Sequence, residues 1–254
     1  MATYKKRGYK PKGKGDEPGN VTDSATAEVF STLDSSASKT EQWVARNQTY
    51  ILGVIGVIAV GVLAFLGYQQ FIQEPREASA SNELFYPLQY FSQAQQNNTQ
   101  ADSLYTLALQ GAEGKYGLLD IVDEYSGTKA ANLARYAAGI SYMNLNQYQE
   151  AISYLEDFKT DDAMLGPISL GNIGDAFMQL DQTSDALGYY ERALAEDTND
   201  FTTPLYLQKA GVAALELGQT QKALEFFSRI KEEYPSSAQA NGVDAFIGMA
   251  QTGN

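Results

Sequence analysis

The side chains in this sequence that could do chemistry are mainly carboxylates, because the chain contains no Cys and no His. That composition excludes thiol nucleophiles, imidazole general bases and Cys–His zinc sites. Neighbouring carboxylates can serve as an acid–base pair or hold a cation, so three clusters of them are candidate sites. The clusters are Asp120 with Asp123 and Glu124, Asp161 with Asp162, and Glu196 with Asp197.

None of these clusters has the pattern of a catalytic or metal site. The first falls in an expected helix with an acidic outer face, so a solvated surface accounts for it. The pairs at 161–162 and 196–197 fall in expected turns and lack the ligand number and spacing of a calcium loop. The stretch LGNIGDA (170–176) is no phosphate loop, since no Lys-Ser/Thr follows it and no strand precedes it. We therefore expect no enzyme activity, no metal and no cofactor.

The stretch YILGVIGVIAVGVLAFLGY, from Tyr50 to Tyr68, carries no charge. As a helix rising 1.5 Å per residue it would be about 28 Å long, close to the roughly 30 Å of a membrane's hydrocarbon core. Aromatic side chains flank it, as they do at membrane interfaces. We predict one membrane helix within 43–72, which contains Gly53, Gly56, Gly61 and Leu66. Because it starts about fifty residues into the chain, we expect an anchor, not a cleaved signal peptide.

Charge is distributed unevenly on the two sides of this segment. Residues 1–49 hold eight Lys/Arg and six Asp/Glu, whereas residues 69–254 hold ten and twenty-five. The positive-inside tendency predicts a cytoplasmic N-terminus and an acidic part on the other side, with the reverse topology as the alternative. The acidic part also argues against nucleic acid as a partner. Residues 1–42 are rich in Gly, Pro, Ser and charge, so we expect a disordered tail in which 27–33 could form a short helix on contact.

The remainder of the chain contains an internal repeat. Gly139, Gly174 and Gly211 are 35 and 37 residues apart. Twelve residues after each glycine stands Ala151, Ala186 or Ala223, and four residues later stands Leu155, Tyr190 or Phe227. Seven residues after each glycine stands Asn146, Asp181 or Gly218, types that tolerate the left-handed conformation of a helix end. Ala193 and Pro235 complete the pattern, which is that of the tetratricopeptide repeat.

This pattern predicts an all-α fold, a tetratricopeptide-repeat helical solenoid behind a single N-terminal transmembrane helix. The small residues let two antiparallel helices approach, and we expect the bulky residue to fill the space between adjacent pairs. A first helix over 76–97, interrupted near Pro87, and a loop over 95–103 precede the repeats. We place the repeats near 98–130, 132–165, 167–200 and 204–236, and a capping helix at 237–250, all within a domain spanning 73–254.

Stacked repeats form a concave groove lined by the first helix of each pair, and such a groove is the expected functional site. Its Met, Tyr, Leu and amide side chains suit contact with a peptide or a partner helix, although some of them could instead be packed core. It lacks the basic clamp that would grip a C-terminal carboxylate. The positions are Leu133, Tyr136, Ile140, Met143 and Asn144, then Ile168, Asp175, Met178 and Gln179, then Leu205, Gln208, Val212 and Leu215.

The segment 117–155, GLLDIVDEYSGTKAANLARYAAGISYMNLNQYQEAISYL, contains a Tyr-x-x-Thr-x-x-x-x-Leu-Ala run and the helix around Ala151. With the tail and the span before it, this architecture resembles the ancillary subunit family of the bacterial Sec translocon (YfgM type). The resemblance implies a scaffold in the inner membrane of Gram-negative bacteria with its repeats in the periplasm. Implied partners are the Sec channel subunits, a membrane-anchored periplasmic prolyl isomerase or chaperone, and exported polypeptides, besides the lipid bilayer. A general adaptor for envelope or cell-wall assembly is the alternative.

Overall fold

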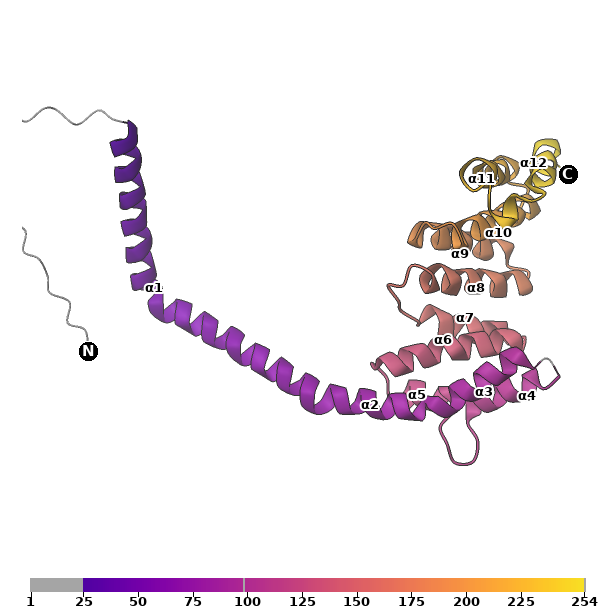
Figure 1. The fold of residues 1–254 in the computed structure, drawn as a ribbon, viewed down its shortest axis with the longest axis horizontal. Helices are drawn as coiled ribbons and strands as arrows, with labels where there is room; N and C mark the ends of the chain where they lie inside the picture. Colours follow the sequence, from indigo (N-terminus) through magenta and orange to yellow (C-terminus); the bar gives the residue numbers. More distant parts are fainter. Residues whose placement is uncertain (1–24, 98, 254) are drawn as a thin grey trace, which may run out of the picture. The chain divides into compact units, whose positions relative to one another are not determined.

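The computed structural model describes residues 25–97 and 99–253, with side chains from residue 41 onward. Within these residues the regular elements are all helices (Figure 1). The chain divides into two compact units, one up to Leu66 and one from Gly67.

The first unit is dominated by α1 (Ala25–Tyr68), which contains the whole predicted apolar segment. A helical run from Glu41 to Gln96 is long and apolar enough to cross a membrane, and its most apolar part is not covered by other protein atoms. Tyr50, Leu66 and Tyr68 are exposed, and a methyl group added at Gly53, Gly56 or Gly61 would touch nothing.

The helix α1 begins inside the segment 1–42 that we expected to be disordered. Residues 1–24, including the basic cluster at 4–14, lie outside the described residues. Residues 25–42, in contrast, are helical, so the expectation of disorder was wrong for them. The reason is that 20–52 contain no Gly or Pro, and nothing in this stretch interrupts a helix that extends back from the apolar segment.

The second unit begins with a π-helical turn, η1 (Gln69–Gln73), followed by α2 (Glu74–Glu83) and α3 (Phe85–Gln96). The break between α2 and α3 falls at Leu84, slightly before Pro87, because a proline lacks the N–H that would bond the carbonyl four residues earlier. The loop that follows is shorter than expected, since α4 (Ala101–Gln110) already starts at residue 101.

From here the chain forms a stack in which each helix contacts the next one along the sequence, as Figure 1 shows from α3 to α12. The helices are α5 (Leu118–Glu124), α6 (Lys129–Asn144), α7 (Tyr148–Glu156), α8 (Leu165–Gln179), α9 (Thr183–Glu196), α10 (Thr202–Glu216), α11 (Thr220–Glu233), the short 3-10 turn η2 (Ala238–Ala240) and α12 (Val243–Thr252). The helix α11 ends two residues before Pro235, as predicted.

The core runs through this stack as neighbouring clusters of buried side chains. Large residues such as Ile173, Leu207 and Phe227 are fully buried, each worth about 2–3 kcal/mol of hydrophobic stabilisation. The last helix has a polar outer side. Asp244 and Gln251 are exposed there, where the equivalent residues of α10, Leu207 and Ala214, are buried. A polar outer face of this kind is what a terminal cap of a helical stack requires.

Candidate functional site

The three repeat glycines let the first helices α6, α8 and α10 lie close to the second helices of their pairs. A Cβ atom added at any of them would come within 2.5 Å of a side chain sixteen residues later: Gly139 faces Leu155, Gly174 faces Tyr190, and Gly211 faces Phe227. The bulky residue thus packs on the glycine of its own pair. The room is there because glycine has no side chain. The bulky residue also reaches the next pair, as expected: Tyr190 stacks on Tyr206 of α10, and Phe227 stacks on Phe246 of α12. The signature alanines of the second helices are buried too: Ala151, Ala186, Ala193 and Ala223.

The three first helices also end in the same way. Asn146, Asp181 and Gly218 all have positive φ angles, of 58°, 58° and 70°, which confirms the prediction of left-handed helix ends. The next residue in each turn donates its backbone N–H to a carbonyl five residues back, as in Gln147 to Tyr142 at 2.9 Å. This is the Schellman arrangement, which satisfies the last carbonyls of a helix. Identical ends give the three helices the same register.

The predicted groove positions all lie on these three helices, and none is fully buried. They stand at the same distances from Gly139, Gly174 and Gly211, so equivalent residues of successive pairs occupy the same helix positions. Leu133 and Val212 are about two-fifths exposed, which is high for aliphatic residues on packed helices. Exposed positions are Leu133, Asn144, Gln179 and Val212; partly exposed ones are Tyr136, Ile140, Met143, Ile168, Asp175, Met178, Leu205, Gln208 and Leu215.

Several of these residues also contribute to the core between repeats. Tyr136, Ile140 and Met143 pack against the cluster around Ile152 and Ile173. Met178, Leu205 and Leu215 pack against the larger C-terminal cluster. Their positions are therefore set by packing, and each shows only part of its surface.

Asp175 is not a free carboxylate. Its oxygens accept hydrogen bonds from the Lys209 ammonium at 2.6 and 2.7 Å and from the Tyr190 hydroxyl at 2.8 Å. Tyr190 stacks on Tyr206, with ring centroids 6.4 Å apart. Burial, and then the Asp175 charge, raises the pKa of both tyrosines well above the usual value. The result is a charge-neutral pair between two first helices.

Sequence reasoning missed Lys209 and Tyr206 as parts of this network. The available signal was the spacing, because Asp175 and Lys209 have opposite charges and stand 34 residues apart, close to one repeat.

Other carboxylates cap helices. Asp120 accepts the backbone N–H of Gly117 at 2.9 Å. Asp162 accepts the N–H groups of Met164 and Leu165, both at 2.9 Å, and these bonds lower the pKa of its carboxyl group. In the part of the chain that the structure describes, no three Asp or Glu side chains come together as metal ligands would.

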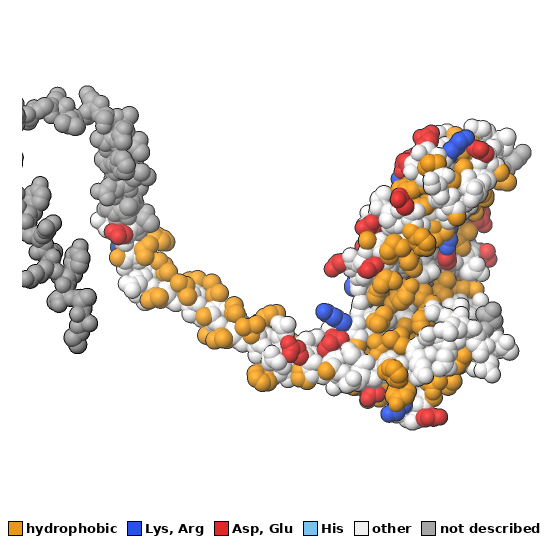
Figure 2. All heavy atoms as spheres, in the orientation of Figure 1, with side chains coloured by type: hydrophobic (Ala, Val, Ile, Leu, Met, Phe, Trp, Pro, Cys, Tyr) orange, Lys and Arg blue, Asp and Glu red, His pale blue; other side chains and the backbone are white. Residues whose placement is uncertain are grey.

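Figure 2 shows one face of the repeats, on which apolar side chains form a patch over the middle of the stack, with Asp and Glu along its edges. An apolar surface with a charged margin is the usual anatomy of a protein-binding surface.

The family comparison agrees with this geometry. The tetratricopeptide repeat family matches residues 136–201 and 172–238. A crystal structure of kinesin light chain TPR-like repeats from Podosopora anserina is 16% identical, covers 70% of this chain and 87% of that chain, and has a TM-score of 0.49. No curated protein matches the chain. The fold is an all-helical tetratricopeptide-repeat solenoid, and such repeats indicate a scaffold for protein–protein interaction.

Proposed function

We propose that this protein is a membrane-anchored scaffold whose groove on α6, α8 and α10 binds a segment of a partner polypeptide. The observation that carries the proposal is the set of partly exposed Leu, Ile, Val, Met, Tyr and amide side chains that repeats on these helices. Asp175 is the one acidic residue among the predicted positions, and Lys209 neutralises it. An apolar segment of low charge is therefore the expected occupant, since the predicted positions offer packing and amide hydrogen bonds and their one charged residue is paired.

We further propose that the partners belong to protein export. They are Sec channel subunits, a membrane-anchored periplasmic prolyl isomerase or chaperone, and exported polypeptides. The support is the order of the parts, a basic tail, one apolar helix and acidic repeats, together with the resemblance of residues 117–155 to the translocon family. The proposed location is the bacterial inner membrane, with one pass, a cytoplasmic N-terminus and periplasmic repeats.

The groove is tested by placing a photo-crosslinking amino acid at Leu133 or Val212, the two most exposed apolar positions. The full chain is crosslinked in native membranes, extracted in mild detergent, purified and analysed by mass spectrometry. The matched control carries the crosslinker at Glu232, an exposed residue on α11 outside the groove. We expect Sec channel subunits and the prolyl isomerase at the groove positions and not at the control.

Crosslinks to envelope-assembly proteins alone would replace the export proposal with the general adaptor. Equal crosslinking at Glu232 and at the groove would refute the groove itself. Topology is tested separately with protease added to intact spheroplasts. Cleavage of the repeats is expected, and their protection would reverse the proposed orientation.

A further inference from the structure

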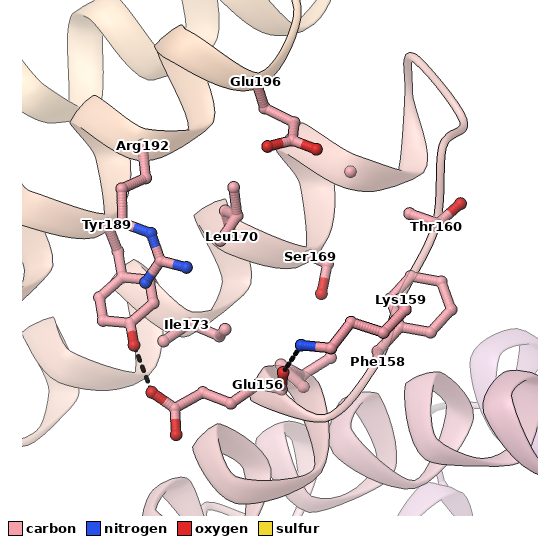
Figure 3. A pocket seen from close by; sticks show the side chains of 12 residues that line it. Glu156, Phe158, Lys159, Thr160, Ser169, Leu170, Ile173, Tyr189, Arg192 and Glu196 are labelled. Carbon is pink, nitrogen blue, oxygen red and sulfur yellow. Dashed lines mark hydrogen bonds between the residues drawn. The ribbon is translucent and has the colours of Figure 1, made fainter. Parts of the chain in front are cut away.

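A pocket lies between consecutive repeats, on the side of α8 away from the groove. Its volume is about 390 Å³, and its walls come from α7, the segment after α7, α8 and α9 (Figure 3). On α8 it is lined by Ser169, Leu170 and Ile173. The groove positions Ile168 and Asp175 point roughly the opposite way, because each residue turns about 100° around a helix. A ligand could therefore occupy this pocket and leave the groove free.

The pocket exists because two features differ from the next repeat. The helix α7 has 9 residues, whereas its counterparts α9 and α11 have 14 each. The chain after α7 also follows a different path, which Asn132 fixes. The side-chain NH2 of Asn132 donates to the Lys159 carbonyl at 2.6 Å, and its side-chain oxygen accepts the Lys159 N–H at 3.0 Å.

The second feature is a small side chain on α8. Ser169 stands where the equivalent position of α10 carries Tyr206. In the next repeat the ring of Tyr206 packs tightly on Gly171 and stacks on Tyr190. With serine in place of tyrosine, and with a shorter α7, the corresponding space stays open.

Ser169 offers a polar group inside this space. The residue is only 4% exposed, and its hydroxyl makes no hydrogen bond with another described residue. Ser141, equally buried on α6, instead donates to the carbonyl of Ala137 at 2.7 Å. Figure 3 shows the Ser169 oxygen pointing into the pocket. Because this oxygen opens on the pocket and has no partner in the protein, it can form a hydrogen bond with a ligand there.

Two cations line the same pocket. Lys159 and Arg192 belong to no ion pair among residues 41–97 and 99–253, although carboxylates outnumber cations by 25 to 10 after residue 68. Arg192 lies 4.5 Å above the ring of Tyr189, which leaves the donors at the edge of its guanidinium accessible. The Lys159 ammonium donates to the Glu156 carbonyl at 2.9 Å and retains further donors.

We propose that this pocket binds one carboxylate of a peptide, either an acidic side chain or a chain terminus. Arg192, Lys159 and Ser169 donate hydrogen bonds to the carboxylate, and the apolar wall of Leu170 and Ile173 contacts the neighbouring part of the peptide. Glu156 and Glu196 also line the pocket, and the Glu156 carboxylate accepts a hydrogen bond from the Tyr189 hydroxyl. The charges of the two glutamates repel any carboxylate that Arg192 and Lys159 do not hold directly. The ligand is therefore a mostly uncharged segment with a single acidic group, bound independently of the groove.

The test uses the full chain in lipid nanodiscs and two random peptide libraries. Both libraries are displayed on phage. In one the peptides are inserted within the coat protein, and in the other they end in a free C-terminus. Enrichment in only one of them shows whether the carboxylate is a side chain or a chain terminus. Enriched peptides are then synthesised in acidic and amide forms. Their affinities are measured by fluorescence anisotropy against the wild type, Arg192→Gln, Ser169→Tyr and the groove variant Leu133→Ser.

We expect enriched peptides that share one carboxylate and that bind both pocket variants at least about tenfold more weakly. Arg192→Gln removes a charged hydrogen bond, and Ser169→Tyr fills the pocket as Tyr206 fills the corresponding space in the next repeat. Replacing the carboxylate by an amide is expected to weaken binding equally, and Leu133→Ser to leave it unchanged. Arg192 is exposed, so its variant keeps the fold, which circular dichroism verifies for both pocket variants. Peptides whose binding Leu133→Ser weakens belong to the groove and are set aside. If the remaining peptides bind Arg192→Gln as tightly as wild type or need no carboxylate, or if no peptide remains, the proposal is overturned.

Discussion

Glu77 accepts the backbone N–H of Ala130 at 2.9 Å across 53 residues of sequence. Its other oxygen accepts the N–H of Lys129 at 2.7 Å, and the Thr128 hydroxyl accepts that of Ala131 at 3.0 Å. The first three N–H groups of α6, which have no partner within the helix, are thus all satisfied. Arg76 adds a bond to the Glu124 carbonyl at 3.0 Å. The segment that follows the apolar helix is therefore fastened to the first repeats.

Replacing Glu77 by Ala should destabilise the repeat domain by about 1 kcal/mol, because two N–H groups lose a charged acceptor at a helix N-terminus. For a domain of this size the melting temperature should fall by roughly 2–4 °C. Thermal unfolding followed by circular dichroism measures this, with Glu232→Ala as the control, since Glu232 is exposed and caps no helix. An equal effect of the two substitutions would show that the bond contributes nothing.

Gly211→Ala should lower stability by about 1–3 kcal/mol, although alanine is normally the better helix former. The reason is that its methyl group would lie 2.5 Å from the ring of Phe227, which is fully buried. Gly188→Ala on α9 is the matched control, because its methyl group would meet nothing within 4 Å. We expect that variant to gain about 0.5–1 kcal/mol. Urea titration of both proteins gives the two free energies of unfolding. If Gly211→Ala is as stable as the wild type, the Phe227 ring can shift to make room for the methyl group.

Lys209→Met should cost about 1–2 kcal/mol, since it leaves the Asp175 carboxylate without its cation in a partly buried position. Both side chains are about a third exposed, at 31% and 32%, so solvent screening keeps the effect below that of a fully buried pair. Lys222→Met breaks the more exposed pair with Glu191 and should cost less than about 1 kcal/mol. Chemical denaturation of the two variants tests the order, and a larger loss for Lys222→Met would contradict it.

The repeat domain should lose stability as the pH rises above about 10. Burial raises the pKa of Tyr190 and Tyr206, and Asp175 raises both further. Between the pKa of a tyrosine in the unfolded chain and the raised pKa in the fold, only the unfolded chain ionises, which favours unfolding. Tyr190→Phe should flatten this alkaline slope. Tyrosinate absorbance measured against pH should show the two groups ionising only as the protein unfolds; ionisation in the native protein would refute their burial.

Asp162→Asn should weaken the start of α8 and change its acid sensitivity. Bonds from Leu165 and Met164 lower the pKa of Asp162, so its contribution is present at neutral pH and is lost as the pH falls below about 4. The variant should be less stable at neutral pH and should lose less stability on acidification. Asp161→Asn, next to it in the chain, serves as the control. Hydrogen exchange of the backbone amides in the first turn of α8 reports the effect. Equal changes in Asp162→Asn and Asp161→Asn would show that Asp162 does not cap α8.

The features that sequence analysis predicted are those with a local cause. The apolar run predicts the long helix because each of its residues favours burial in lipid. Asn146, Asp181 and Gly218 predict helix ends because only certain residues adopt a positive φ without strain. The small and bulky residues sixteen apart predict paired helices, because a helix without a side chain at that position leaves room for the bulky residue of its partner.

Other features depend on where distant residues meet. Nothing near Glu77 in the sequence indicates that it caps α6, and nothing near Asp175 indicates the lysine that neutralises it. The pocket beside Ser169 arises from the early end of α7, which the Asn132 bonds to Lys159 hold in place. Sequence by itself therefore determined the apolar helix, the repeat period and the ends of the first helices, through local conformational preference. Tertiary structure alone decided which charges are neutralised and where space remains, because both depend on contacts between residues far apart in the chain.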